Sequence, residues 1–435
     1  MNLGSDCTSC TTREAVRTLV VGLTVLLALV VAAPRAEAGP GDGIRQGYFL
    51  IHPAVAVEGR YDTNVFRVGP DDQQTDLTAA PLLRLLPQVT IETLPSRKAE
   101  LQGTAGLELR TFLHDSPQVD NQSNFGAHLD LRGAVGMDSW IGAEAIERFY
   151  FQPEPGSDQN FLTDVTTFDR LYNHTELRGV LRPGHGMLEF TPRYQLLLER
   201  FLDFSVADRT IHTVGLDGRW KFFPKTAVVV RSSYGWREFD NDYIPSSNPL
   251  RVTGGLLGLI TPKLSLDLEV GYGNSFTDEA ESFSSVIGTL RATERFTERM
   301  ILSGGYRRDF RDTPWSSHYD SHLFDLRWNQ QIAGQVGIQA GVSYEFRFFT
   351  PLLASQRGVT LRDEIRDERQ DGVTRGELLV EWHPNDWFTV GAGYQLERRA
   401  TDAIAAIETS DGMATIVNDA AYIKHQVYTR LGVLY

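Results

Sequence analysis

The sequence predicts an all-β fold, a closed antiparallel transmembrane β-barrel of about 18 strands, with 16 strands as the alternative. Three observations predict this fold. The chain begins with an export signal, windows in which apolar and polar residues alternate recur after residue 47, and the last residue is aromatic. Short periplasmic turns and longer extracellular loops are expected for a barrel of this kind in Gram-negative bacteria.

The export signal occupies the first 38 residues. Arg13 and Arg17 precede an apolar run at 19–33, and small residues at 36–38 form a cleavage site, so we predict cleavage between Ala38 and Gly39. The run is shorter than the roughly 20 apolar residues that a spanning helix needs. We therefore predict a signal peptide at 1–38, a short periplasmic N-terminal segment at 39–46, and an outer-membrane barrel at 47–435.

Cysteine content and charge exclude several classes of protein. Both cysteines, Cys7 and Cys10, lie in the predicted signal peptide, so the exported chain must fold without disulfides. The formal net charge of -14 argues against nucleic acid as a partner.

Strand alternation is clear at 263–276, which reads KLSLDLEVGYGNSF. One face of this window is apolar and the other is polar or glycine, as in a strand with lipid on one side and a polar lumen on the other. The windows run for about 10 to 15 residues, longer than the usual 5 or 6 of soluble sheets.

The connections between these windows fall into two classes. Eight are short turns, at 94–98, 136–140, 182–186, 222–226, 261–265, 296–300, 332–337 and 383–387. Nine are longer and polar, near 62–80, 113–121, 152–166, 203–208, 241–249, 277–281, 312–317, 349–371 and 401–420. If the two classes alternate, these 17 connections join 18 strands, and both termini lie on the periplasmic side.

The end of the last strand is predicted to be an assembly signal. One face of this strand carries Ile423, Val427, Leu431 and Val433, and the chain ends on Tyr435. This ending resembles the signal that the barrel-assembly machinery reads. Because an open sheet edge in lipid leaves backbone groups unpaired, the first and last strands should pair.

Metal and catalytic sites are not expected. His318 and His322 would lie about 13 Å apart along a strand, too far for one zinc ion. The cluster SSHYD at 316–320 contains Ser, His and Asp, but adjacency in sequence is not triad geometry, so we interpret it as a polar surface loop. Asp62 and Asn64 match only the start of a calcium loop. We predict no catalytic residue, metal or cofactor.

Projection of the strands places a mixed set of charges on the polar face. The predicted pore-lining residues are Arg110, Arg132, Arg178, Arg193, Arg219, Arg231, Arg291, Arg307, Arg327, Arg347, Arg430, Glu108, Asp130, Glu176, Asp267, Glu269 and Glu345. Two interpretations remain open: ion pairs that stiffen the wall, or a water-filled passage whose arginines contact an anionic or hydroxyl-rich solute. The charged connection at 349–371 is either a constriction or a solvated loop.

The segment GYFLIHPAVAVEGRYDTNVFR at 47–67 resembles the first strand of the putative beta-barrel porin 2 family. Phe49, Ile51 and Pro53 match the start of the family motif, and its turn is matched by Tyr61, Asp62, Asn64, Val65 and Phe66. The resemblance implies a barrel of 16 to 18 strands. Several members are associated with capsular or exopolysaccharide secretion, beside a periplasmic polysaccharide-export protein. The plan is also similar to that of the alginate exporters, but the carboxylates interleaved here do not favour a strongly anionic polymer.

The leading hypothesis is therefore an outer-membrane channel, integral in the lipid, that exports an exopolysaccharide or capsular polymer through a charged aqueous lumen. A general or substrate-selective diffusion porin for small hydrophilic solutes is the alternative. A structural or enzymatic outer-membrane barrel is the third hypothesis.

Overall fold

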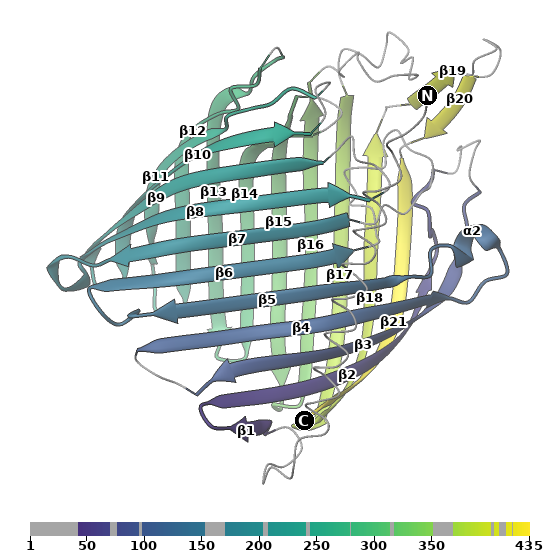
Figure 1. The fold of residues 1–435 in the computed structure, drawn as a ribbon, viewed down its shortest axis with the longest axis horizontal. Coiled ribbons are helices and arrows are strands. Elements are labelled where there is room, and N and C mark those ends of the chain that lie inside the picture. The colour runs from purple at the N-terminus through teal and green to yellow at the C-terminus, as the bar shows by residue number, and fades with distance from the viewer. Residues whose placement is uncertain are drawn as a thin grey trace, which may run out of the picture.

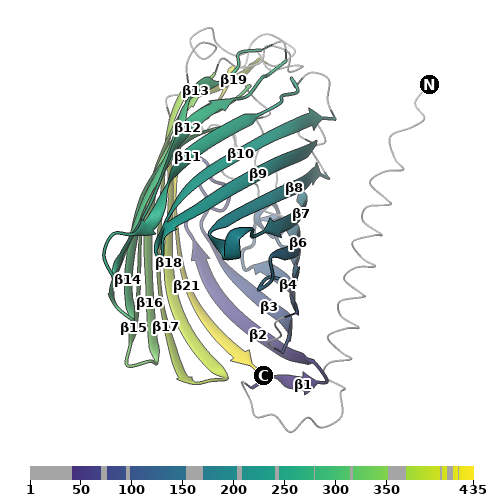
Figure 2. The ribbon, with the colours of Figure 1, turned by 90° about the vertical axis from the view of Figure 1, so that its left-hand side faces the viewer.

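The computed structural model describes residues 42–69, 76–94, 98–152, 170–202, 208–240, 244–278, 280–313, 317–350, 369–401, 404–408, 415–419 and 421–435. Across these residues, 18 long antiparallel strands form one sheet that closes into a barrel (Figures 1 and 2). The strands are β2 (Phe49–Asp62), β3 (Ala80–Thr93), β4 (Ala99–Phe112), β5 (Phe125–Val135), β6 (Ile141–Gln152), β7 (Arg170–Leu181), β8 (Leu188–Phe201), β9 (Arg209–Phe223), β10 (Thr226–Phe239), β11 (Leu250–Leu259), β12 (Leu264–Asn274), β13 (Ser284–Thr297), β14 (Met300–Arg311), β15 (Tyr319–Ile332), β16 (Val336–Phe349), β17 (Arg369–Asn385), β18 (Phe388–Thr401) and β21 (Tyr422–Leu434).

The barrel closes where β2 pairs with β21, as predicted for the first and last long strands. The register joins Ala54 to Leu434 and Asp62 to Gln426, so the seam runs over most of both strands. Closure gives the backbone groups of both edge strands partners, which lipid could not supply.

The predicted count of 18 strands and the predicted order of connections are confirmed. The eight short turns join β3 to β4, β5 to β6 and every second pair of neighbouring strands after that, ending with β17 and β18. The nine long connections join the remaining neighbours at the opposite end of the barrel. The turn at 136–140 requires glycine, because Gly136 has φ +63° and a Cβ there would lie 2.7 Å from the carbonyl oxygen of Ile141.

Both ends of the described chain lie at the end with the short turns (Figure 2). The backbone N–H of Leu434 donates to the carbonyl of Trp387, in the turn between β17 and β18. The N–H of Leu94, in the turn after β3, donates to the carbonyl of Tyr48.

Several short elements were not predicted. The strand β1 (Ile44–Gln46) pairs with the start of β2, inside the segment expected to precede the barrel. The long connections carry α2 (Pro117–Asp120) and the hairpin of β19 (Ile404–Glu408) and β20 (Thr415–Asp419), and one short turn carries the 3-10 helix η1 (Gly184–Gly186). No helix within the described ranges is long and apolar enough to cross a membrane.

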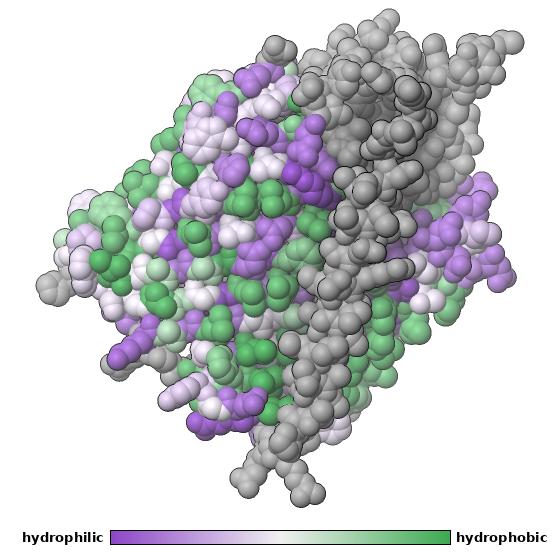
Figure 3. Space-filling model, viewed as in Figure 1, coloured by the Kyte–Doolittle hydropathy of each residue, from purple (hydrophilic) through white to green (hydrophobic). Residues whose placement is uncertain are grey.

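The two faces of the wall differ as the alternation predicts. Val57 and Tyr61 point outward and are 44 % and 50 % exposed, whereas Glu58 between them is fully buried on the inner face. Apolar side chains spread over the strands of the outer face in Figure 3, and hydrophilic ones gather around α2. This outer surface suits contact with lipid acyl chains.

Candidate functional site: the inner wall of the barrel

The predicted pore-lining residues all lie on the strand face opposite the exposed apolar side chains. Arg110, for example, follows the outward Leu109, and Arg430 precedes the outward Leu431. Their placement on the inner wall therefore follows the alternation, and their role in lining an open passage stays a prediction.

Most of these arginines form ion pairs, with an acid on the same strand, on the adjacent strand or two strands away. Arg132 lies 2.6 Å from Glu144, and Arg178 joins Glu144 at 3.1 Å to Glu176 at 2.6 Å. Further pairs join Arg110 to Glu108, Arg193 to Asp217, Arg231 to Glu269, Arg291 to Asp325 and Arg347 to Glu345. The ion-paired wall, one of the two interpretations of the sequence, is thus present over much of the barrel.

A dense cluster of charges lies at the seam between the first and last long strands. The buried carboxylate of Glu58 contacts Arg60 at 2.8 Å, Arg84 of β3 at 2.6 Å and Arg430 of β21 at 2.8 Å. One carboxylate thereby links three adjacent strands across the point of closure. The alternation in the sequence predicts that Glu58 and Arg60 face the lumen, although neither is among the predicted pore-lining residues. Arg84 was not predicted, although the same alternation places it on the inner face.

The motif that follows β2 forms the turn that was predicted. The backbone N–H of Asn64 donates to Oδ1 of Asp62 at 3.0 Å. The Asn64 side chain accepts from the N–H of Val68 at 3.1 Å and donates to its carbonyl at 2.8 Å. Side chains of Asp and Asn commonly stabilise turns in this way.

The same motif also fastens the seam, which the sequence alone did not indicate. Nδ2 of Asn64 donates to the carbonyl of Ile423 at 3.2 Å, and Asp62 accepts from Nε2 of Gln426 at 2.7 Å. Lys424 lies 2.6 Å from the same Asp62 carboxylate. The motif is therefore a contact between the two ends of the barrel sheet.

The apolar end of the motif covers the inner face near the long loops. Val65 and Phe66 pack against a buried cluster formed by Ala80, Leu82, Phe112 and Val119. The loop after β2 thus contacts β3, β4 and α2 instead of extending away from the barrel.

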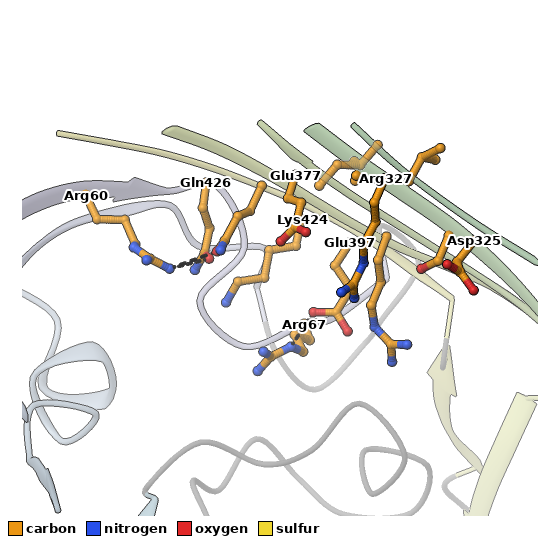
Figure 4. Close-up of a pocket in the computed structure, with 15 residues that line it drawn as sticks. Arg60, Arg67, Asp325, Arg327, Glu377, Glu397, Lys424 and Gln426 are labelled. Atoms are coloured by element: carbon orange, nitrogen blue, oxygen red, sulfur yellow. Dashed lines mark hydrogen bonds and ion pairs between the residues drawn. The ribbon is translucent and has the colours of Figure 1, made fainter. Parts of the chain in front are cut away.

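Two polar cavities lie on the inner wall. The seam cavity, of about 320 Å³, is lined by residues of β2, the loop after it, β15 to β18 and β21, including Arg60, Arg67, Arg327, Glu377 and Lys424 (Figure 4). The second cavity, of about 310 Å³, is lined by residues of β8 and β10 to β14. Both volumes lie at the lower end of the range for small-molecule sites.

A few charged side chains of the inner wall do not take part in the ion pairs. Within the part of the chain that the structure describes, the side chains of Arg219, Arg307 and Arg327 have no ion pair or hydrogen bond, and neither do the carboxylates of Asp267 and Glu377. Arg307 and Asp267 line the second cavity, and Arg327 and Glu377 line the seam cavity. Each cavity therefore contains one cation and one anion that are available to a solute.

An aromatic row crosses the inner wall on the strands β5 to β7. His128, Tyr150 and Tyr172 are register neighbours on β5, β6 and β7. Their ring centroids lie 6.4 Å and 5.9 Å apart, and the Tyr150 hydroxyl donates to Asp130 at 2.7 Å. The row presents ring surface beside hydrogen-bonding groups.

In the cluster interpreted as a polar surface loop, Ser317, His318 and Tyr319 are buried instead. Ser317 and His318 are 7 % and 4 % exposed, because the Ser317 hydroxyl is held between the carbonyl of Glu281 at 2.8 Å and the hydroxyl of Thr350 at 2.9 Å. Burial lowers the pKa of His318 to about 4, so the ring is neutral at neutral pH. Its Nε2 lies 3.9 Å from Asp320, too far for a hydrogen bond.

The two histidines considered for zinc do not form a site with other ligands. Nδ1 of His322 interacts with the Tyr306 hydroxyl at 2.8 Å. No group of three potential ligands drawn from His, Cys, Asp and Glu could hold a metal ion, as far as the described residues go. Ser316, the cleavage position after Ala38, and residues 351–368 of the charged connection lie outside the described residues.

Comparison with known proteins identifies one family and several distant structures. The sequence profile of the family described as Putative beta-barrel porin 2 matches residues 38–403. A search of curated proteins finds no match.

Three solved structures illustrate the structural similarity. OpdK of Pseudomonas aeruginosa, solved with vanillate, has a TM-score of 0.45 at 9 % identity, over 88 % of this chain and 99 % of that one. OccAB3 of Acinetobacter baumannii has a TM-score of 0.44 at 9 % identity, with the same two coverages. The FrpB iron transporter of Neisseria meningitidis has a TM-score of 0.44 at 7 % identity, over 88 % and 81 %.

Proposed function

Because the chain belongs to the Putative beta-barrel porin 2 family and folds as an integral outer-membrane barrel, we propose that it is a passive channel for hydrophilic, hydroxyl-rich solutes. The observation that carries the proposal is the contrast between the two faces of the wall. The outer face is apolar, whereas the inner face is an array of arginine–carboxylate pairs with two polar cavities. An 18-stranded barrel is wide enough for an aqueous passage.

Within this function, the solute that we propose is a surface polysaccharide on its way out of the cell. The pairing of charges favours a neutral or weakly charged polymer, because paired guanidinium and carboxylate groups still exchange hydrogen bonds with hydroxyls but carry little net field. The aromatic row of His128, Tyr150 and Tyr172 supports the same choice, since ring surfaces bury the apolar faces of sugar rings.

The proposed export function also implies an orientation of the barrel in the membrane and two partner proteins. Both termini lie in the periplasm, where a polysaccharide-export protein delivers the polymer and where the barrel-assembly machinery has read Tyr435. No covalent step belongs to the proposal. In keeping with this, the buried Ser317 hydroxyl is already bonded to the Glu281 carbonyl, and the ring of His318 is not exposed to a solute.

A substrate-selective porin for small solutes is the second candidate, because each cavity has the volume of a small-molecule site. Deletion of the gene and a liposome-swelling assay distinguish polysaccharide export from a porin for small solutes. A deletion strain should lose surface polysaccharide and regain it with the gene supplied in trans; normal polysaccharide in the deletion strain would contradict export. Liposome swelling with mono- and disaccharides at high rates would then favour the porin.

The aromatic row gives a test of polymer contact. Tyr150→Ala and Tyr172→Ala should each weaken the block of ion current by a neutral oligosaccharide several-fold, because each removes a stacking surface. Tyr194→Ala is the matched control, since Tyr194 pairs with His212 on the outer face. Equal effects of the inner and outer substitutions would contradict the assignment.

A further inference from the structure

Two sets of residues on the inner wall share one arrangement but differ in one contact. In the first set Arg291, Gly305 and Asp325 are register neighbours on β13, β14 and β15. Arg291 and Asp325 reach over the glycine and form an ion pair at 2.9 Å. A Cβ at Gly305 would lie 3.1 Å from Oδ1 of Asp325, so the glycine makes room for the bridge.

In the second set the same arrangement lacks the bridge. Arg327, Gly341 and Glu377 are register neighbours on β15, β16 and β17, and a Cβ at Gly341 would lie 2.8 Å from Oε1 of Glu377. Within the described residues, neither the side chain of Arg327 nor that of Glu377 has an ion pair or hydrogen bond. Two strand spacings separate their backbones by about 10 Å. This second set is called the open clamp here.

The open clamp faces the seam cavity of about 320 Å³. Figure 4 shows Arg327 and Glu377 extending from the strands into the same space. Most other charges that line this cavity are engaged: Arg60 with Glu58, Arg67 with Glu397, and Lys424 with Asp62. The cavity therefore contains a donor without an acceptor, an acceptor without a donor, and space between them for a solute.

We propose that the open clamp is a binding subsite for one neutral, polyhydroxylated sugar unit of the passing solute, with Arg327 donating to its hydroxyl oxygens and Glu377 accepting from its hydroxyl groups. A sugar hydroxyl both donates and accepts, so adjacent hydroxyls on one ring satisfy both charges together. Charge-assisted hydrogen bonds of this kind are about twice as strong as neutral ones. The Ser343 hydroxyl in the same cavity adds a further polar contact. The subsite rests on the proposed sugar channel and names its contact residues.

The test is equilibrium binding of a short dextran to the full-length protein in detergent, measured by titration calorimetry. The readout does not depend on conduction. Arg327→Gln and Glu377→Gln should each weaken binding about tenfold, because each removes a charged hydrogen-bonding partner. Gly341→Leu, which keeps both charges but fills the space between them, should weaken binding at least as much.

Matched controls use the same substitutions away from the cavity. Arg299→Gln and Glu298→Gln change the charge equally in the exposed turn between β13 and β14 and should leave binding unchanged. Heat-modifiable mobility on gels confirms that each variant is folded. Binding that is unchanged in Arg327→Gln and Glu377→Gln would overturn the subsite, as would equal losses in the control variants.

A second titration distinguishes ligand classes. The free amino acid glycine is a zwitterion, so its carboxylate and ammonium groups could pair with Arg327 and Glu377. Tighter binding of free glycine than of dextran would overturn the sugar assignment. Absence of ion current from a protein that still binds dextran through the open clamp would instead contradict the channel and leave the subsite standing.

Discussion

Glu58→Gln tests whether the charge cluster at the seam holds the barrel closed. The Glu58 carboxylate is fully buried and contacts Arg60, Arg84 and Arg430 at 2.6 to 2.8 Å. Glutamine keeps the size of the side chain but removes the charge that three guanidinium groups share. Removal of one partner from a buried ion pair costs about 3 to 5 kcal/mol. We expect the free energy of unfolding to fall by about that amount.

The assay is equilibrium unfolding in guanidinium chloride of the barrel in lipid vesicles, followed by tryptophan fluorescence and by gel mobility. Glu92→Gln is the matched control, because the Glu92 side chain is 43 % exposed and lies 3.8 Å from His52. An exposed pair of that kind contributes about 0 to 1 kcal/mol. Equal unfolding midpoints for Glu58→Gln and Glu92→Gln would refute the claim that the buried cluster stabilises the seam.

Three further predictions concern the seam motif, a short turn and a buried loop. Asn64→Ala removes three hydrogen bonds and should lower the free energy of unfolding by about 2 to 4 kcal/mol, at about 1 kcal/mol each; a change below about 0.5 kcal/mol would count against the motif as a fastener. Gly136→Ala forces a side chain onto φ +63° and should cost about 1 to 3 kcal/mol, whereas Gly337→Ala, with nothing within 4 Å, should be tolerated. His318 has a folded pKa of about 4 against 6.5 in the open chain, so its contribution to stability is present above pH 6.5 and is lost as the pH falls toward 4. The protection factors of the amides at residues 317–319, which correct for the slower intrinsic exchange at low pH, should fall over that window, and His318→Asn should remove the dependence.

The alternation in the sequence was sufficient to predict the strands, the faces and the closure. Lipid imposes this regularity, because each strand must pair its backbone and present apolar side chains outward. The window at 263–276 therefore predicted β12 (Leu264–Asn274) to within two residues at either end. Short elements such as β1 and α2 have no such periodic signal and were not predicted.

The contacts of the inner wall were predicted only in part. Alternation places Arg327 and Glu377 on one face, but which arginine finds a carboxylate depends on register across several strands. Arg291 and Arg327 look alike in the sequence, yet only Arg291 bridges over its glycine to an acid. The contact between Asp62 and Gln426 spans 364 residues, which no local pattern reveals.

The interpretation of SSHYD as a surface loop was wrong for a related reason. Polar residues between two strands usually face solvent, but here the Ser317 hydroxyl finds partners at Glu281 and Thr350, on two other loops. Hydrogen bonds of this kind compensate for the burial of polar groups.

The ion current of the full-length protein in planar bilayers tests the channel most directly. A passage lined by paired charges should give stepwise conductance increases on insertion, with weak preference between potassium and chloride. Correctly folded barrels that insert without conductance would contradict the channel, and so would a strong preference for one ion, since that requires a wall with a large net charge.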